Sequence, residues 1–287
     1  MEGTLTLLVV VPDDADPSPW CSLAAGQAAV RTILACPENR RISSWGSNCS
    51  VVYSAHGRSI FHMWGAAMRQ VSSTYVAVAD ARCPPSSTWL SAALRAMADG
   101  VPAFFGPVSF RDTGDRLSVV EYLLEYGQFS PPVHNSMNEV PGNNFVFRLD
   151  LLDQRVLKDE QFHKVFFVDQ LRLRGLPPVF CDGLEVFYSK RYRPKRYLVR
   201  RFAHGRTYAA MRAQASGLGM RLLRGLSSPV LPLLRIGRVA NSVSGKPELR
   251  AALLRHLGYA AAAETAWSLG ECVGYLTARP GDPANLD

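Results

Sequence analysis

The first half of the 287-residue chain alternates short apolar runs with blocks of helical composition. Predicted strands cover residues 5–11, 32–36, 51–53, 75–79 and 103–110. Predicted helices cover residues 19–30, 59–70 and 87–98. Strands separated by helices of about ten residues are typical of βαβ units, which build a mainly parallel sheet. The alternation therefore predicts an α/β domain.

The second half continues this pattern and then changes character. A helix is expected at 118–126, a turn-rich loop at 128–139, a strand within 140–148, and one long helix or two at 150–174. Gly175 and the following prolines are a helix stop signal, and short strands are expected at 179–181 and 184–188. Beyond about residue 192 the chain becomes basic and amphipathic. We therefore expect an α/β domain at 1–192 and a helical C-terminal extension at 193–287.

The predicted strand at 75–79 ends abruptly in an acid, Asp80, which is followed by Ala81, Arg82 and a proline-rich turn. In an open α/β sheet, ligands bind just beyond the carboxyl ends of the strands. An acid at that edge typically contacts a ribose, a phosphate or a metal ion. This placement makes the chain a candidate nucleotide-binding enzyme.

The net charge of +8 is concentrated after residue 170, with few acids between Lys190 and Arg238. Positive charge can indicate nucleic acid, an anionic membrane surface or a phosphorylated substrate. No recognition-helix, zinc-finger or RNP-type motif accompanies it, so nucleic acid ranks below the other two.

Cysteine and histidine spacings indicate neither a metal site nor a disulfide framework. The six cysteines include no CxxC pair, and the six histidines show no HExxH spacing. No apolar run is long enough to span a bilayer, and the N-terminal apolar run lacks a preceding basic region. We therefore expect a cytoplasmic protein, peripheral on the inner face of the membrane if the tail binds lipid.

Several segments, in their order and spacing, resemble the family-2 glycosyltransferases, which have the GT-A fold. The segments are LLVVVP, MWGAAMRQVSSTYVAVADARCPPSSTWL, FFGPV, EVPGNNFVFRLDLL, FHKVFFVDQLRLRG, RRFAHGRTYAAMR and AWSLGECVGYLTARPG. The resemblance implies a Rossmann-like, mainly parallel mixed sheet flanked by helices, with a basic amphipathic helical extension. It also implies inverting transfer of a hexose from a nucleotide-sugar donor to an acceptor hydroxyl, in glycan or glycolipid assembly.

The family's metal-binding motif is altered in this chain. Members usually bind a divalent cation through Asp-x-Asp; here Asp80 matches the first acid, but Arg82 occupies the second acidic position. A guanidinium group repels a cation and can pair with phosphate oxygens in a bidentate manner. Two interpretations stay open: metal-independent donor binding by Arg82, or an Arg82 that only pairs with Asp80. The cofactor expectation is accordingly none, or Mg²⁺ or Mn²⁺ at Asp80.

The position of the catalytic base is altered as well. The resemblance places the family's acid at Lys164, beside His163. A lysine acts as a base only if its surroundings lower its pKa by several units, whereas a histidine needs no such change. Asp169, farther along the same predicted helix, is a third candidate. The alternative is that all three residues lie on a solvent-facing stripe.

Other segments supply candidate substrate contacts. Pro12, Asp13 and Glu38 are candidates for the nucleoside pocket, although Asp13 and Glu38 also suit an ordinary helix cap and a surface turn. Acceptor binding is expected from a loop with a flexible glycine and two amides, unless that loop is only an Asx-type turn. Its residues are Gly142, Asn143 and Asn144.

The basic region offers a further phosphate contact. Arg201, His204 and Arg206 surround Gly205 and could clamp a diphosphate. The tail at 218–239 mixes leucines, prolines and arginines, which suits either a segment lying at lipid headgroups or a helix docked on the core. A glycosyltransferase is the leading hypothesis. A non-catalytic homologue that acts as a binding or scaffolding partner is the alternative.

Overall fold

The structure is a computed structural model, and it describes residues 3–12, 15–40, 42, 48–55, 59–133, 139–153, 157, 161–214 and 216–282. The chain forms two compact units. Unit 1 comprises Met1–Arg111 and Phe129–Ser189, and unit 2 comprises Asp112–Gln128 and Lys190–Asp287. We describe each unit by itself.

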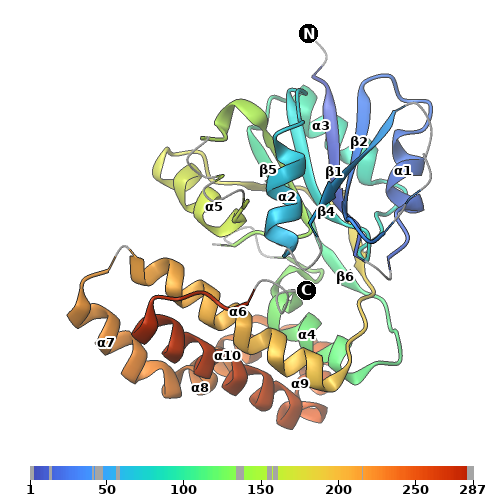
Figure 1. The fold of residues 1–287 in the computed structure, drawn as a ribbon. Helices are drawn as coiled ribbons and strands as arrows, with labels where there is room; N and C mark the ends of the chain where they lie inside the picture. The colour runs from blue at the N-terminus through green and yellow to red at the C-terminus, as the bar shows by residue number, and fades with distance from the viewer. Residues whose placement is uncertain are drawn as a thin grey trace. The chain divides into compact units, whose positions relative to one another are not determined.

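Unit 1 contains a seven-stranded sheet of order β3-β2-β1-β4-β7-β5-β8 (Figure 1). Its strands are β1 (Leu5–Val10), β2 (Val30–Pro37), β3 (Cys49–Ser54), β4 (Tyr75–Asp80), β5 (Ala103–Phe105), β7 (Asn144–Arg148) and β8 (Val179–Phe180). Neighbouring strands run parallel, except that β7 is antiparallel to β4 and β5. The expected α/β fold with a mostly parallel sheet is therefore confirmed.

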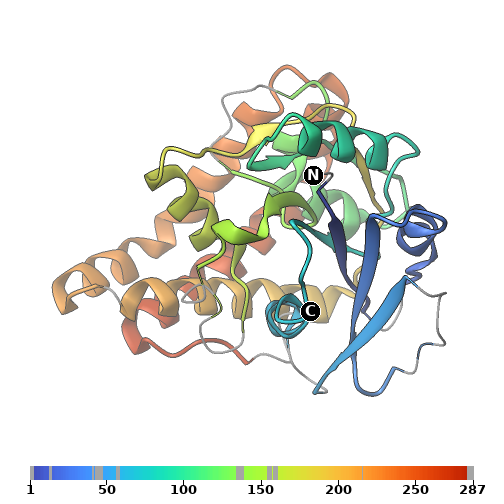
Figure 2. The same ribbon diagram turned by 90° about the horizontal axis from the view of Figure 1, so that it is seen from above.

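Helices cover both faces of this sheet, and so β1 and β4 are buried along their whole length. Helices α1 (Ser18–Ala24) and α3 (Trp89–Ala98) meet through Trp20 and Trp89, whose rings pack edge to face at 5.1 Å. Helix α2 (Ile60–Met68) lies on the other face (Figure 2). Because neither face of these two central strands is left to water, each is a nearly continuous apolar run rather than an alternating one.

The expected strand at 103–110 is wrong, because the chain breaks it in two. Strand β5 belongs to the main sheet, whereas β6 (Val108–Phe110) pairs with β9 (Val186–Tyr188) in a separate sheet. The break falls at Gly106 and Pro107. A Cβ on Gly106 would lie 2.0 Å from the carbonyl oxygen of Leu184, so only glycine allows this close approach of two backbones.

The expected helical segment at 150–174 is only partly helical among the described residues. It contains a short 3₁₀ helix, η2 (Leu149–Leu151), and then α5 (Lys164–Leu173), which ends before Gly175 at a φ of 74°. Phe162, just before α5, is fully buried and stacks on Phe147 at 5.9 Å. The next residue, His163, has an extended backbone, so α5 does not continue back through Phe162.

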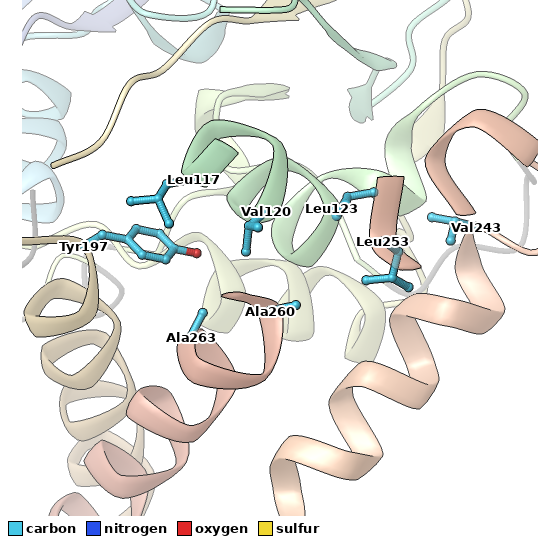
Figure 3. Packing of buried hydrophobic residues seen from close by; sticks show 8 residues of the cluster. All are labelled: Leu117, Val120, Leu123, Tyr197, Val243, Leu253, Ala260 and Ala263. Atoms are coloured by element: carbon cyan, nitrogen blue, oxygen red, sulfur yellow. The ribbon is translucent and has the colours of Figure 1, made fainter. Parts of the chain in front are cut away.

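Unit 2 is helical. Its helices are α4 (Arg116–Glu125), α6 (Pro194–Gln214), α7 (Leu218–Ser227), α8 (Leu231–Ser242), α9 (Pro247–Arg255) and α10 (Leu257–Thr277). One face of α4 packs against residues of four other segments of unit 2 (Figure 3). The buried side chains of this cluster are Leu117, Val120, Leu123, Tyr197, Val243, Leu253, Ala260 and Ala263.

The two units thus differ from the two consecutive domains expected from the sequence. The main division at 189/190 lies close to the expected one, but α4 is inserted into unit 2 from within the first segment. The reason is its apolar face, whose partners are residues far along the chain.

Helices α6 and α10 run side by side in close contact (Figure 1). A Cβ on Gly205 would lie 2.1 Å from the carbonyl oxygen of Trp267, and a Cβ on Gly270 would lie 2.1 Å from that of Phe202. Glycines therefore set the separation of these two helices. Among the described residues, no helix combines the length and apolar character needed to cross a bilayer.

Candidate functional site

The carboxyl ends of the central strands of unit 1 are in register. Val10, the last residue of β1, is paired with Ala35 of β2 and with Asp80 of β4. Strand β7 begins beside this edge, because Asn144 is paired with Ala79. The register therefore brings the turn after β1, the acid of β4 and the asparagines before β7 to one edge of the sheet.

Asp80 and Arg82 form a buried, two-pronged ion pair at this edge. Arg82 donates from Nε to Oδ1 of Asp80 at 3.1 Å and from a terminal nitrogen to Oδ2 at 3.0 Å. The backbone N–H of Arg82 also donates to Oδ1 at 2.9 Å. The Asp80 side chain is fully buried, whereas 14% of the Arg82 side chain is exposed. The Arg82 side chain is therefore partly exposed, and its guanidinium group is oriented by the carboxylate of Asp80.

These residues do not fit a divalent cation. Both carboxylate oxygens of Asp80 accept hydrogen bonds from Arg82, and a hard cation needs several oxygen ligands. Across the described residues, no group of three or more His, Cys, Asp or Glu side chains is suitably placed to hold a metal ion. The positive charge at this position comes from the protein itself.

Asn144, one of the expected acceptor contacts, makes hydrogen bonds within unit 1. Its Oδ1 accepts from the indole N–H of Trp89 at 2.9 Å, and its Nδ2 donates to the carbonyl oxygens of Pro107 (3.2 Å) and Leu184 (2.6 Å). The residue is fully buried, and both donors of its amide are used within unit 1. Asn144 is therefore a structural residue that fixes the start of β7.

Asn143 is the better candidate of the two. Its Nδ2 donates to Sγ of Cys83 at 2.8 Å, which ties the loop before β7 to the turn after Asp80. Its Oδ1 is buried and has no hydrogen-bond partner among the described residues. Sequence reasoning missed Cys83, because an isolated cysteine is indistinguishable from a small hydrophobic residue.

The N-terminus of α5 lies beside the same loop. Nζ of Lys164 donates to the carbonyl oxygen of Val140 and lies 3.7 Å from the position of a Cβ on Gly142. His163 precedes the helix, with Nε2 2.8 Å from Oε1 of Gln161 and its ring stacked on Phe61 at 4.6 Å. Lys164 therefore contacts the candidate acceptor loop directly, and His163 is its neighbour in the chain.

Asp169 lies elsewhere on α5. Its side chain is 57% exposed and pairs with Arg172 at 3.9 Å, one turn farther along. This is the solvent-facing arrangement that the sequence analysis left open as the alternative.

The turns after β1 and β2 are linked by a residue that sequence reasoning did not select. The guanidinium group of Arg40 donates to the carbonyl oxygens of Pro12 and Ala15, the latter at 2.5 Å. Glu38 is exposed on the turn after β2. Asp13 lies outside the described residues. Arg40 thus holds together the two turns from which the nucleoside pocket was expected.

The basic cluster around Gly205 lies in unit 2, and its members have partners there. Arg201 is almost fully buried, and it donates to Glu125 and, at 2.5 Å, to Glu264. Burial alone would lower the pKa of Arg201, but the surrounding carboxylates outweigh burial and raise it. The guanidinium group of Arg201, expected as part of a diphosphate clamp, is therefore held in internal ion pairs in the structure.

The other two members of this cluster are less buried. His204 stacks on Trp267 at 6.2 Å, and Arg206 donates from Nε to the carbonyl oxygen of Arg279 at 3.0 Å. Both contacts join α6 to α10 or to the segment after it.

Comparison with known proteins gives a result at the level of structure only. No family model matches the sequence, and no curated protein matches it either. One similar solved structure is the mannosyltransferase PcManGT from Pyrobaculum calidifontis in complex with GDP-mannose and Mn²⁺. It has a TM-score of 0.53 and 14% identity, over 96% of this chain and 88% of that one.

A second match is to a Bacillus anthracis protein assigned as a glucose-1-phosphate thymidylyltransferase, in complex with sucrose. Its TM-score is 0.40 and its identity 8%, over 62% of this chain and 87% of that one, which is too weak to support an inference. Together with the sheet order, the similarity to PcManGT shows that the chain has a GT-A-like α/β fold.

Proposed function

We propose that the protein is a glycosyltransferase that moves a sugar from a nucleotide-sugar donor to an acceptor hydroxyl, in glycan or glycolipid assembly. The observation that carries this proposal is the Asp80–Arg82 pair at the carboxyl end of β4 in a GT-A-like fold. The similar mannosyltransferase holds GDP-mannose, which supports a nucleotide sugar as the class of donor. The family resemblance supports inverting transfer of a hexose.

Arg82 takes the role that a metal ion plays in related enzymes. The leaving diphosphate gains negative charge in the transition state, and a pre-oriented cation stabilises that charge without reorganising. The carboxylate of Asp80 fixes the guanidinium group by two hydrogen bonds. A guanidinium group also matches the geometry of two phosphate oxygens. The divalent cation of the similar structure is therefore not part of this proposal.

The acceptor is proposed to lie at the loop before β7. Gly142 allows close approach, and Asn143 supplies a buried amide oxygen that has no described partner. Lys164 positions this loop through the carbonyl of Val140. We assign proton abstraction to His163, because an imidazole accepts protons near neutral pH. Pro12 and Glu38 remain proposed nucleoside contacts.

Donor turnover in the presence and absence of EDTA tests this proposal. A panel of nucleotide sugars is assayed with the wild type, with Arg82→Lys and with Arg148→Lys. Arg148 makes the same two-pronged pair with Asp150, but on the surface, so it is a matched control. We expect turnover that survives EDTA and falls about 100-fold in Arg82→Lys only. Turnover abolished by EDTA and restored by Mn²⁺ would contradict the role of Arg82.

The base assignment is tested by a second pair of variants. His163→Gln should lower kcat with little change in the donor KM, whereas Asp169→Asn should not. A loss of kcat in Asp169→Asn alone would transfer the role of the base to that residue.

A non-catalytic homologue is the second candidate. Arg82 and Lys164 replace the two acids of the family, and each has a partner inside the protein. Arg82 pairs with Asp80, and Lys164 donates to a backbone carbonyl oxygen, which favours a structural role for both residues. This alternative predicts no turnover with any nucleotide sugar, with or without added metal.

A further inference from the structure

Helix α7 presents its leucines to solvent and its arginines to the protein. Arg221 donates to the carbonyl oxygens of Tyr275 (3.1 Å) and Leu276 (3.0 Å), at the C-terminal end of α10. Arg224, one turn on, lies over the ring of Tyr275 at 5.8 Å. Gly225 is buried, and a Cβ there would lie 3.2 Å from the Leu276 side chain. The glycine and arginine side of the helix is therefore its docked side.

Helix α8 repeats this orientation. Arg235 turns inward and donates to the buried carboxylate of Glu264. Leu233 and Leu234 point away from that contact and are exposed. We define the leucine face as the exposed leucines of these two helices, whose exposed fractions lie between 43% and 76%. They are Leu218, Leu222, Leu223, Leu226, Leu233 and Leu234.

An amphipathic helix on a protein in water normally turns its apolar residues inward. The leucine face does the opposite on two consecutive helices, both of which pack against α10. Large apolar side chains left exposed on two consecutive helices indicate an interaction site, because burying each leucine stabilises the bound state.

The charge of the same region identifies the partner. No Asp or Glu occurs between Val186 and Pro247, and Lys195, Arg196, Arg212 and Arg238 are exposed. Unit 1 carries nearly equal numbers of acidic and basic residues, so the net charge of +8 resides in unit 2. A second copy of this basic unit would repel the first, whereas an anionic lipid surface attracts it.

We propose that unit 2 binds an anionic bilayer surface, with the leucine face inserted at the headgroup level and exposed cations of unit 2 drawn toward lipid phosphates. Interfacial binding of this kind combines buried apolar area with attraction to anionic lipid, and it needs no membrane-spanning helix. The inference rests on unit 2 alone and goes beyond the proposed transfer reaction. Failure of the sugar-transfer assay would therefore leave it standing.

Cosedimentation of the full chain with vesicles tests this. The vesicles are phosphatidylcholine alone, or phosphatidylcholine with phosphatidylglycerol at a ratio of about 7:3. We expect the wild type to bind the anionic vesicles at least about 10-fold more tightly. The triple variant Leu222→Ser/Leu226→Ser/Leu233→Ser should lose about 10-fold or more of that binding. Because these side chains are exposed, the variant should retain the wild-type circular dichroism spectrum and melting curve.

Leu173→Ser is the matched control, because Leu173 is 88% exposed but lies in unit 1, outside the leucine face. Its binding to anionic vesicles should equal that of the wild type. A folded triple variant that binds as well as the wild type would overturn the proposal, and so would a wild type that binds neither vesicle. Light scattering tests the alternative occupant. If the wild type is a dimer, the triple variant is a monomer and neither binds vesicles, the leucine face would instead be the contact with a second copy of the chain.

Discussion

Replacing Arg82 by methionine tests how much the buried Asp80–Arg82 ion pair contributes to the free energy of unfolding. The substitution removes two hydrogen bonds to Asp80, at 3.1 and 3.0 Å, and keeps one from the backbone N–H of residue 82 at 2.9 Å. Asp80 is fully buried, so its carboxylate would lose the charge of Arg82 in a poorly solvated place. Removing one partner of a buried ion pair costs about 3–5 kcal/mol of stability. Because 14% of Arg82 is exposed and water can approach there, we expect about 3 kcal/mol.

Arg148 provides a control with nearly identical chemistry. It pairs with Asp150 through the same two nitrogens, but the side chains are 40% and 62% exposed. Solvent-exposed pairs contribute about 0–1 kcal/mol, so Arg148→Met should change stability by less than about 1 kcal/mol. The two variants thus separate burial from hydrogen-bond geometry.

Urea unfolding followed by tryptophan fluorescence is a suitable assay, because Trp20, Trp64 and Trp89 all lie in unit 1. Equal losses in the two variants would show that burial does not strengthen the Asp80–Arg82 pair, and so would an Arg82→Met loss below about 1 kcal/mol.

Three further outcomes are expected. Gly270→Ala should destabilise unit 2 by about 2 kcal/mol or more, because the new methyl group would lie 2.1 Å from a backbone carbonyl oxygen. Gly237→Ala is the control, because nothing lies within 4 Å of a Cβ there, and equal melting curves for the two variants would contradict the prediction. Burial alone would raise the pKa of Glu125, but the arginine charges beside it outweigh burial and hold it at about 2. The free energy of unfolding of the wild type should therefore exceed that of Glu125→Gln by its full amount above about pH 4.5, and this excess should vanish as the pH falls toward 2. An excess that does not change with pH would show that ionised Glu125 does not stabilise the fold. A hydrogen bond from the Cys21 thiol lowers the pKa of Cys49, whereas burial raises the pKa of Cys36 to about 11. Iodoacetamide should therefore modify Cys49 at a lower pH than Cys36, which peptide mapping can measure.

The sequence allowed the sheet edge to be predicted well, because its signals are local. An apolar run that ends in Asp80 marks both a buried strand and the position of its carboxyl end. The pairing of Asp80 with Val10 then follows from the parallel arrangement of neighbouring strands. The position of Arg82 beside this acid is likewise local, since the two residues are two apart in the chain.

The surroundings of other candidate residues depend on contacts between distant segments, which the sequence does not show. Arg201 stands in a basic stretch and looks solvent-exposed, yet its carboxylate partners are 76 and 63 residues away in sequence. Asn143 and Asn144 are adjacent and chemically identical, and only the positions of Trp89 and Cys83 distinguish their roles. The outward orientation of the α7 leucines also depends on which side of the helix binds the end of α10.

Nucleoside diphosphate binding in EDTA, measured by calorimetry with UDP, GDP, CDP and dTDP, shows whether Arg82 replaces the metal ion. We expect at least one of them to bind the wild type without metal, and we expect Arg82→Lys to weaken this binding while Arg148→Lys does not. At about 100 times its dissociation constant, that ligand should stabilise the fold by ~2.7 kcal/mol. Binding that requires Mn²⁺, or that is unchanged in Arg82→Lys, would contradict the claim that Arg82 replaces the metal ion.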